Sequence, residues 1–377
     1  MEKEKRMNIL VIGPSGSGKS TLIKAVSGQE VLIGTGEGQT KNISVYKSDI
    51  WPLNFIDTMG FEYDIVAQLK TIKQVRKYTK NKIKEEDNNG IDAVWYCIDG
   101  TTKRVFHQNV RLMSVSIKGW KNIPIFAVIT KSLVEKDIPE NIKAVQNAFA
   151  KEKSTNLKSI IPIVAKEYQV NDTIVSPFGL ERLCNETLDC FEEAKSISKE
   201  NRDSMILNQK RFLSQRIIGV ASTAAVTVAL VPLPSLITDS TLLVPIEVKM
   251  TKDIFRVYGI KYSEGIIDKI IGGAAITIIA KQIVQAIPLV GIVANVVVAG
   301  SVVATLGEGI VAASEAIYTG KIPQEDLDRI TDTINDKIEH NKIVGVVAKY
   351  FEKNKDNLAN KKPKEIFDEI MNTTKKK

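Results

Sequence analysis

One segment constrains the fold of this chain more than any other. Residues Gly13 to Ser20 match the pattern GxxxxGK[ST] in full. An apolar, β-branched run, Asn8–Ile12, precedes the segment, and a helix-like stretch, Ser20–Val26, follows it. A strand, a glycine-rich loop and a helix in this order gather backbone N–H groups and the positive end of the helix around one point. The pattern therefore predicts a buried strand and a helix joined by a loop that binds phosphate.

Strand and helix signals alternate through the rest of the first part of the chain. Further strand-like runs lie at Asn42–Tyr46, Leu53–Ile56, Ala93–Ile98, Ile123–Ile129 and Ile160–Val164. Helix-like stretches lie between them at Ile65–Lys84, Val105–Ile117, Ile142–Ala150 and Leu180–Ala194. Apolar strands that alternate with amphipathic helices are typical of a mostly parallel sheet with helices on both faces. We therefore predict an α/β domain over residues 1–195.

Charge falls sharply in residues 213–320, which carry about seven basic and seven acidic residues. This shift predicts a linker helix over 196–212, a hydrophobic all-α domain over 213–320, and a polar helical tail over 321–377. Prolines 232, 234, 245 and 288 are expected to break the helices of the hydrophobic domain. The mixture of charged and apolar positions in Glu247–Arg256 predicts a helix on the surface of a bundle.

The composition excludes several protein classes. Of the 377 residues, 44% are hydrophobic and 25% are charged, as in ordinary folded proteins. Three cysteines rule out a disulfide scaffold, and with only His107 and His340 a zinc site is not expected. The net charge of +8 allows anionic partners without selecting one, and we expect no nucleic acid. No signal peptide is visible at the amino end, so we expect a cytoplasmic protein.

The phosphate-loop pattern predicts a role for several residues in and near the loop. Lys19 is expected to reach the β- and γ-phosphates of a nucleotide, and the Ser20 hydroxyl to bind Mg²⁺. Asp57, at the end of the strand-like run Leu53–Ile56, suits the water-mediated binding of the same Mg²⁺, and Gly60 suits an N–H contact with the γ-phosphate. The nucleotide-binding candidates of the loop are Gly13, Ser15, Gly16, Ser17, Gly18, Lys19, Ser20 and Thr21.

Taken in order, these motifs resemble those of the P-loop GTPases. After the phosphate loop, that class has a switch threonine, DxxG and [NT]KxD. Here the boxes are Thr40 (with Thr35 as an alternative), Asp57-Thr58-Met59-Gly60, and Thr130-Lys131. Ala165-Lys166 resembles the last box, whose backbone contacts guanine. The resemblance implies GTP or GDP and Mg²⁺ as cofactors, Thr40 as a metal ligand, and Lys19, Thr40 and Gly60 as catalytic residues.

The sequence departs from the GTPase pattern in two places. Ser132 and Leu133 follow Thr130-Lys131, so the aspartate that recognises guanine is missing, and Glu135 or Asp137 would have to replace it. Phe61 follows DxxG where many GTPases carry the glutamine that orients water, so hydrolysis should be slow. A P-loop ATPase or kinase therefore stays an alternative. The segment Trp95–Asp99 followed by Arg104 resembles the septin, Toc and immune-associated branch of the GTPases. Arg104 and His107 are candidates for a homodimer interface at the nucleotide face.

Residues 225–259, with Pro232-Leu233-Pro234, Lys249-Met250 and Tyr258-Gly259, resemble the hydrophobic C-terminal domain of YcjF-like proteins. Two charge-free runs, Ile217–Thr238 and Gln282–Gly307, are about as long as a membrane span. A tightly packed soluble bundle would have the same composition, so membrane insertion, membrane association and a soluble bundle all stay open. A second alternative function is a non-enzymatic membrane scaffold that holds nucleotide. The basic stretch Lys70–Lys84 is expected to be a solvated face.

Overall fold

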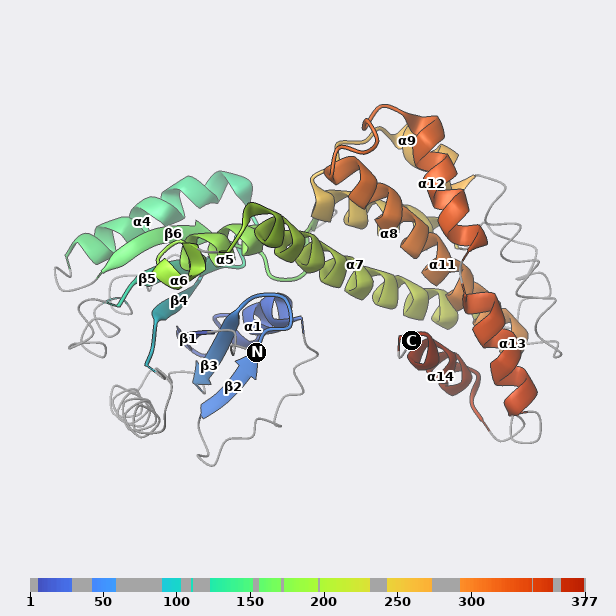
Figure 1. Ribbon diagram of the computed structural model, residues 1–377, viewed down its shortest axis with the longest axis horizontal. Coiled ribbons are helices and arrows are strands. Elements are labelled where there is room, and N and C mark those ends of the chain that lie inside the picture. Colours follow the sequence, from blue (N-terminus) through green and yellow to red (C-terminus); the bar gives the residue numbers. More distant parts are fainter. Residues whose placement is uncertain are drawn as a thin grey trace. The chain divides into compact units, whose positions relative to one another are not determined.

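The structure is a computed structural model. It describes residues 6–28, 43–58, 90–102, 110, 123–151, 156–170, 173–195, 197–230, 243–272, 292–340, 342–354 and 361–375. The chain divides into two compact units, Met1–Gln209 and Lys210–Lys377. The first unit runs from blue to green in Figure 1, and the second from yellow-green to red.

A six-stranded sheet forms the centre of the first unit. Its strands are β1 (Met7–Ile12), β2 (Ile43–Lys47), β3 (Leu53–Thr58), β4 (Ala93–Asp99), β5 (Ile125–Thr130) and β6 (Leu157–Pro162). Their order is β2-β3-β1-β4-β5-β6. Only β2 runs antiparallel to its neighbour, and the other pairs are parallel. The prediction of a mostly parallel α/β sheet is therefore confirmed.

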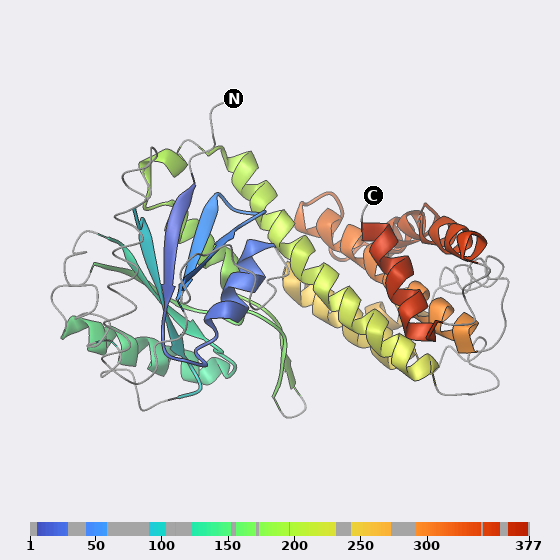
Figure 2. The ribbon, with the colours of Figure 1, turned by 90° about the horizontal axis from the view of Figure 1, so that it is seen from below.

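Alternate residues of the central strands pack on opposite faces of the sheet. On one face Tyr96 lies against Phe149 of α4 (Ile138–Ala150), with ring centroids 6.3 Å apart. On the other face the indole N–H of Trp95 donates to the hydroxyl of Thr187, 3.0 Å away in α5 (Leu180–Leu188). Helices therefore cover both faces, as the buried and almost uncharged strands require (Figure 2).

The strand order indicates at which edge of the sheet a ligand would bind. The chain leaves β1 through α1 (Lys19–Ser27), continues to β3 on one side of β1, and later forms β4 on the other side. In open α/β sheets, ligands bind beyond the carboxyl ends of the strands at such a reversal. Gly13, Asp57, Asp99 and Lys131 all lie at the carboxyl ends of β1, β3, β4 and β5 or directly after them.

Two local expectations for the first unit are wrong. The single helix expected over Leu180–Ala194 ends at Leu188, and a short α6 (Glu192–Lys195) follows a turn in which Cys190 and Phe191 donate to carbonyls of α5. The last strand begins earlier than expected, at Leu157, and is followed by a hairpin of β7 (Tyr168–Val170) and β8 (Thr173–Val175) that the sequence analysis missed. A 3₁₀ turn, η1 (Glu135–Asp137), precedes α4.

Helices are the only regular elements among the described residues of the second unit, so the predicted helical C-terminal region is confirmed. It begins within α7 (Lys199–Ala229), the helix in which the first unit ends. The other helices are α8 (Val244–Tyr258), α9 (Glu264–Ile271), α11 (Ile292–Tyr318), α12 (Leu327–Glu339), α13 (Ile343–Lys353) and α14 (Pro363–Lys375). The long apolar helix α11 packs against α8, α12 and α14.

The surface helix expected over Glu247–Arg256 forms, with Lys249 exposed, but two of its acidic residues do not face solvent. Glu247 and Asp253 are both buried in α8, together with Phe255. Pro245 opens this helix rather than breaking it, because its first-turn position needs no N–H.

Two helices among the described residues, Lys199–Ala229 and Val293–Tyr318, have the length and composition of a membrane span. Within the protein, 89% of the most apolar window of the second helix is buried, compared with 44% for the first.

Candidate nucleotide site

The loop between β1 and α1 has the conformation that its glycines predict. Gly16 and Gly18 adopt left-handed backbone angles, with φ of 78° and 84°. A side chain at Gly13 would clash with the carbonyl oxygen of Cys97 in β4. Within the described part of the chain, no side chain caps the amino end of α1. The first N–H groups of this helix are therefore available to an anion, and a phosphate fits there.

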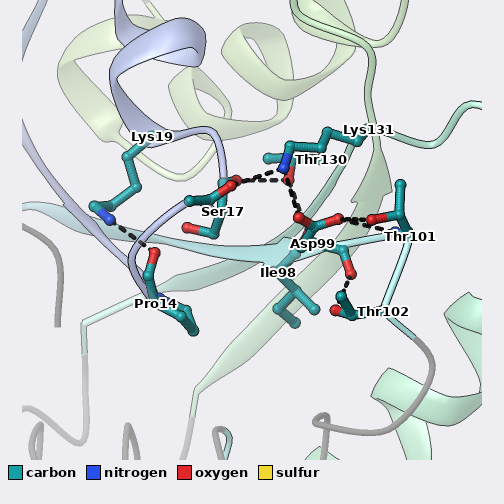
Figure 3. Close-up of polar contacts among 10 residues, drawn as sticks. Pro14, Ser17, Lys19, Ile98, Asp99, Thr101, Thr102, Thr130 and Lys131 are labelled. Atoms are coloured by element: carbon teal, nitrogen blue, oxygen red, sulfur yellow. Dashed lines mark hydrogen bonds and ion pairs between the residues drawn. The ribbon is translucent and has the colours of Figure 1, made fainter. Parts of the chain in front are cut away.

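Lys19 lies across this loop. It is only 6% exposed, and its ammonium donates to the carbonyl oxygens of Gly13 and Pro14 at 2.9 and 3.0 Å (Figure 3). Burial lowers the pKa of Lys19. The loop thus holds the Lys19 ammonium group beside the amino end of α1. A phosphate bound at this end of the helix would lie next to the ammonium.

Ser20 and Asp57 lie together at the mouth of the loop. The Ser20 hydroxyl donates to Oδ2 of Asp57 across 3.3 Å. Mg²⁺ is bound by few protein oxygens and keeps several waters when phosphates complete its shell. A hydroxyl and a carboxylate at this separation fit such an ion. Among the described residues, no cluster of three or more His, Cys, Asp or Glu side chains offers a different metal site.

Thr130 and Lys131 fasten the phosphate loop to the neighbouring strand ends (Figure 3). The Thr130 hydroxyl lies 2.6 Å from the carbonyl oxygen of Ser17 and 3.0 Å from that of Ile98. The Lys131 ammonium donates to the carbonyl oxygen of Gly16 at 2.8 Å. Lys131 itself has a left-handed backbone, with φ of 50°, an uncommon conformation for a residue with a side chain.

The second partner of Lys131 is Asp99, at the end of β4. Its Oδ2 lies 2.6 Å from the ammonium, while Oδ1 accepts hydrogen bonds from the backbone and hydroxyl of Thr101. Burial by itself raises the pKa of Asp99, but the hydrogen bonds from Lys131 and Thr101 outweigh burial and lower it. The carboxylate is therefore held in its charged form. Asp99 was not among the predicted site residues, although Asp99 and Thr130 pair in the parallel register.

The structure does not bring an acidic residue to the position of the missing aspartate. Leu133 occupies it, and its N–H donates to the carbonyl oxygen of Lys131 at 2.8 Å. Glu135 and Asp137 belong to the 3₁₀ turn that follows. Among the described residues, no hydrogen bond or ion pair joins either carboxylate to the phosphate loop.

The last box lies on a neighbouring segment. The N–H of Ser132 donates to the carbonyl oxygen of Ile163 at 3.1 Å. Ile163 lies two residues before Ala165, so this hydrogen bond joins the two boxes. Ala165 is buried, and the exposed Lys166 lies over the ring of Tyr168, 5.1 Å from its centroid.

Several predicted positions lie outside the described residues. They are Thr35, Thr40, Met59, Gly60, Phe61, Arg104, His107 and the basic stretch Lys70–Lys84.

Comparison with solved structures gives likenesses of low TM-score. A protein described as a probable GTP-binding protein engB has 22% identity and a TM-score of 0.35, and the match covers 48% of this chain and 97% of that one. Elongation factor SelB from Methanococcus maripaludis, in complex with the GTP analogue GppNHp, has 22% identity and a TM-score of 0.30 over 43% of this chain and 30% of that one. A mutation variant of the protein SsGBP has 18% identity and a TM-score of 0.34 over 52% of this chain and 57% of that one.

Comparison with family models supplies the assignment. No curated protein matches the chain. Residues 8–131 match the family model described as 50S ribosome-binding GTPase. The matched segment begins in β1 and ends at Lys131, so it contains the phosphate loop, Asp57 and the Thr130-Lys131 box. The match therefore supports a GTP-binding domain of the P-loop GTPase class in this part of the chain.

Proposed function

We propose that this protein is a nucleotide-driven switch that binds GTP with Mg²⁺ and hydrolyses it slowly. The observation that carries the proposal is the bridge from Lys131 to both Gly16 and Asp99, which ties the base-side box to the phosphate loop. A nucleotide has to contact both regions at once, and this bridge holds them in a fixed relation. Guanine selectivity without the aspartate at Leu133 is part of the proposal.

We assign the hydrolysis steps to the chain as follows. Lys19 and the first N–H groups of α1 bind and orient the phosphates, and Ser20, Asp57 and Thr40 would hold Mg²⁺, which neutralises developing phosphate charge when bound. Gly60 would contact the γ-phosphate. Phe61 cannot orient a water molecule as a glutamine does, which supports a low intrinsic rate.

The coupling of nucleotide state to the helical unit is proposed to run through α7. Gln209 accepts the indole N–H of Trp51 at 2.9 Å and donates to the carbonyl oxygen of Ala25 in α1. The next residue, Lys210, donates to the carbonyl oxygen of Val257 in α8 at 2.8 Å. Gln209 is thus hydrogen-bonded to α1, which follows the phosphate loop, and Lys210 is hydrogen-bonded to α8 of the helical unit. These contacts of two adjacent residues support α7 as the connecting element.

The location of the protein is also a proposal. We place it in the cytoplasm with peripheral membrane association through residues 213–320, and the extensive burial of α11 favours a packed bundle over insertion. Alkaline carbonate should then release the protein from membranes. A YcjF-like identity of this unit, a septin- or Toc-like branch for the first unit, and a homodimer through the nucleotide face stay proposals that rest on sequence resemblance.

Calorimetric titration with GTP, GDP and ATP, each with Mg²⁺, tests the proposed function. We expect guanine nucleotides to bind at least about tenfold more tightly than ATP, a difference of about 1.4 kcal/mol. Lys19→Ala should abolish binding of all three, whereas Lys151→Ala, at the far end of α4, should leave binding unchanged. Equal or tighter ATP binding would contradict the GTPase proposal and favour an ATPase or kinase. Guanine binding without turnover would favour the scaffold.

A further inference from the structure

A half-open cavity of about 730 Å³ lies between helices of the second unit and has no part in the nucleotide site. Helices α7, α11, α13 and α14 line it, together with the end of α12. Its volume is within the range of about 300–1,000 Å³ that is usual for small-molecule sites. The apolar part of the lining consists of Ile218, Ala304, Ile343, Val346, Phe367 and Met371.

Two hydroxyls in the cavity wall have no hydrogen-bond partner among the described residues. Ser222 of α7 is 2% exposed and Thr305 of α11 is 1% exposed, and both line the cavity. Hydroxyls in helices commonly donate to the carbonyl four residues earlier. Thr223 does so to Gly219 and Ser314 to Ile310. Ser222 and Thr305 do not, and buried polar groups without partners in native proteins call for an explanation.

The charged groups around the cavity favour an anionic ligand. Lys337 and Lys342 line it, and neither has an ion pair among the described residues. The carboxylate of Glu308 already accepts a hydrogen bond from Gln215 at 2.8 Å, and His340 is paired with Asp336 at 3.2 Å. Asp368, which is exposed, is the other acidic group of the lining. The two unpartnered hydroxyls can donate hydrogen bonds, and the two lysines line the same cavity, so an anion is the ligand that all four groups could bind.

We propose that this cavity binds a small amphipathic anion, with an acyl-type apolar body and a carboxylate or phosphate head. The apolar wall would bury the body, and the hydroxyls of Ser222 and Thr305 with the lysine ammonium groups would donate to the head. Such a ligand would pair with both the polar and the apolar groups of the lining. Water would leave the apolar side chains without a contact partner, and a hydrocarbon would leave the hydroxyls and the lysines without one. The site is independent of the nucleotide site.

Titration of the full chain with dodecanoate and dodecyl phosphate tests the proposal, with dodecan-1-ol as the uncharged analogue. We expect one ligand per chain, and binding of one or both anions at least about tenfold tighter than that of the alcohol. Comparison of the two anions identifies the head group. Inorganic phosphate should not compete with these anions for the cavity, because it lacks the apolar body.

Variants with matched controls separate the site from general hydrophobic adsorption. Thr305→Val and Ser222→Ala keep the packing and should each weaken anion binding severalfold, while GTP binding stays unchanged. Ser314→Ala removes a hydroxyl of α11 that already has a partner, and Lys349→Gln removes a lysine of α13 outside the cavity, so neither should matter. Lys342→Gln should weaken the anions but not the alcohol. Equal binding of anion and alcohol, or equal losses in the control variants, would overturn the proposal.

Discussion

A few side chains fix the shape of the phosphate loop from the neighbouring strand ends. Thr130 and Lys131 contact carbonyl oxygens of Ser17 and Gly16, and Asp99 fixes the Lys131 ammonium from β4. The Lys131 and Asp99 side chains are 26% and 19% exposed, so the pair is only partly screened by water. The loop therefore depends on a carboxylate that is distant in the sequence from both of its motifs.

Asp99→Asn should weaken nucleotide binding. The asparagine keeps the size of the side chain but removes its charge, so the Lys131 ammonium loses its ion-pair partner and is less firmly held against Gly16. We expect GTP affinity to fall about fivefold, equivalent to ~1 kcal/mol. Calorimetric titration at constant ionic strength measures the change.

Asp189→Asn is the matched control for this variant. Asp189 pairs with Arg202 at the same 2.6 Å in the same unit, but it contacts no residue of the phosphate loop among the described residues. It should leave GTP affinity unchanged. If the two variants behave alike, the Asp99–Lys131 pair does not act on the nucleotide site.

Sequence analysis predicted the residues of the candidate site that belong to contiguous motifs, but it did not predict the residues that hold these motifs in place. Lys19 and Ser20 follow from one pattern, and Asp57 from its place at a strand end. The role of Asp99 depends on the pairing of β4 with β5, which no local pattern specifies. The contact of Gln209 with Trp51 joins positions 158 residues apart and depends on tertiary packing alone.

Among the helices, α8 contains two buried carboxylates that differ in their partners. Asp253 is paired with both Lys249 and Arg256, at 2.8 and 2.9 Å. Glu247 is 2% exposed, and burial raises its pKa from the ordinary 4.5 to about 7. A carboxyl group whose folded pKa is raised keeps its proton in the folded state after the unfolded chain has lost it. The stability of the fold therefore falls as pH rises from about 4.5 to about 7, and the loss is constant above that.

Glu247→Gln should stabilise the protein at pH 8 and have little effect at pH 4.5. Glutamine has no charge to bury. The variant therefore avoids the loss of folding free energy caused by the buried carboxylate, which is at most about 3 kcal/mol in the wild type. We expect a gain of about 1–2 kcal/mol at pH 8, measured by denaturant unfolding at several pH values. Asp253→Asn should instead destabilise the protein at pH 8, since it removes the negative charge that pairs with Lys249 and Arg256. A Glu247→Gln effect that is independent of pH would contradict the explanation.

Periodicity predicted which elements exist better than where they end or which face they bury. The alternating strands and the amphipathic C-terminal helices follow from apolar spacing. The helix expected over Leu180–Ala194 ends early because local hydrogen bonds of Cys190 and Phe191 close a turn. The charges of α8 suggested a surface helix, because a charged residue is usually exposed. Lys249 and Arg256 lie four residues before and three after Asp253, so both can pair with it on the same helix while it is buried.

For the molecule as a whole, α7 is the element that both units share. Gln209, the last residue of the first unit, and Lys210, the first of the second, are both buried, and each is hydrogen-bonded within its own unit. Lys210 also lies over the ring of Tyr318, 4.8 Å from its centroid. Gln209 contacts α1 directly through the carbonyl oxygen of Ala25, so it is the residue of α7 at which to test whether nucleotide binding affects the helical unit.

Gln209→Met should separate nucleotide binding from its proposed effect on the helical unit. Methionine keeps the volume of the side chain but leaves the Trp51 N–H and the Ala25 carbonyl without their partner, at a cost of about 1–3 kcal/mol for each buried group. In the wild type we expect GTP·Mg²⁺ to slow amide hydrogen exchange in α8 and α11. In the variant, GTP should still bind but this slowing should be lost. Gln215→Met, on the same helix but bonded to Glu308, should preserve it. A wild type whose residues 210–377 exchange at the same rates with and without nucleotide would contradict the switch, because the helical unit would then not sense the bound GTP.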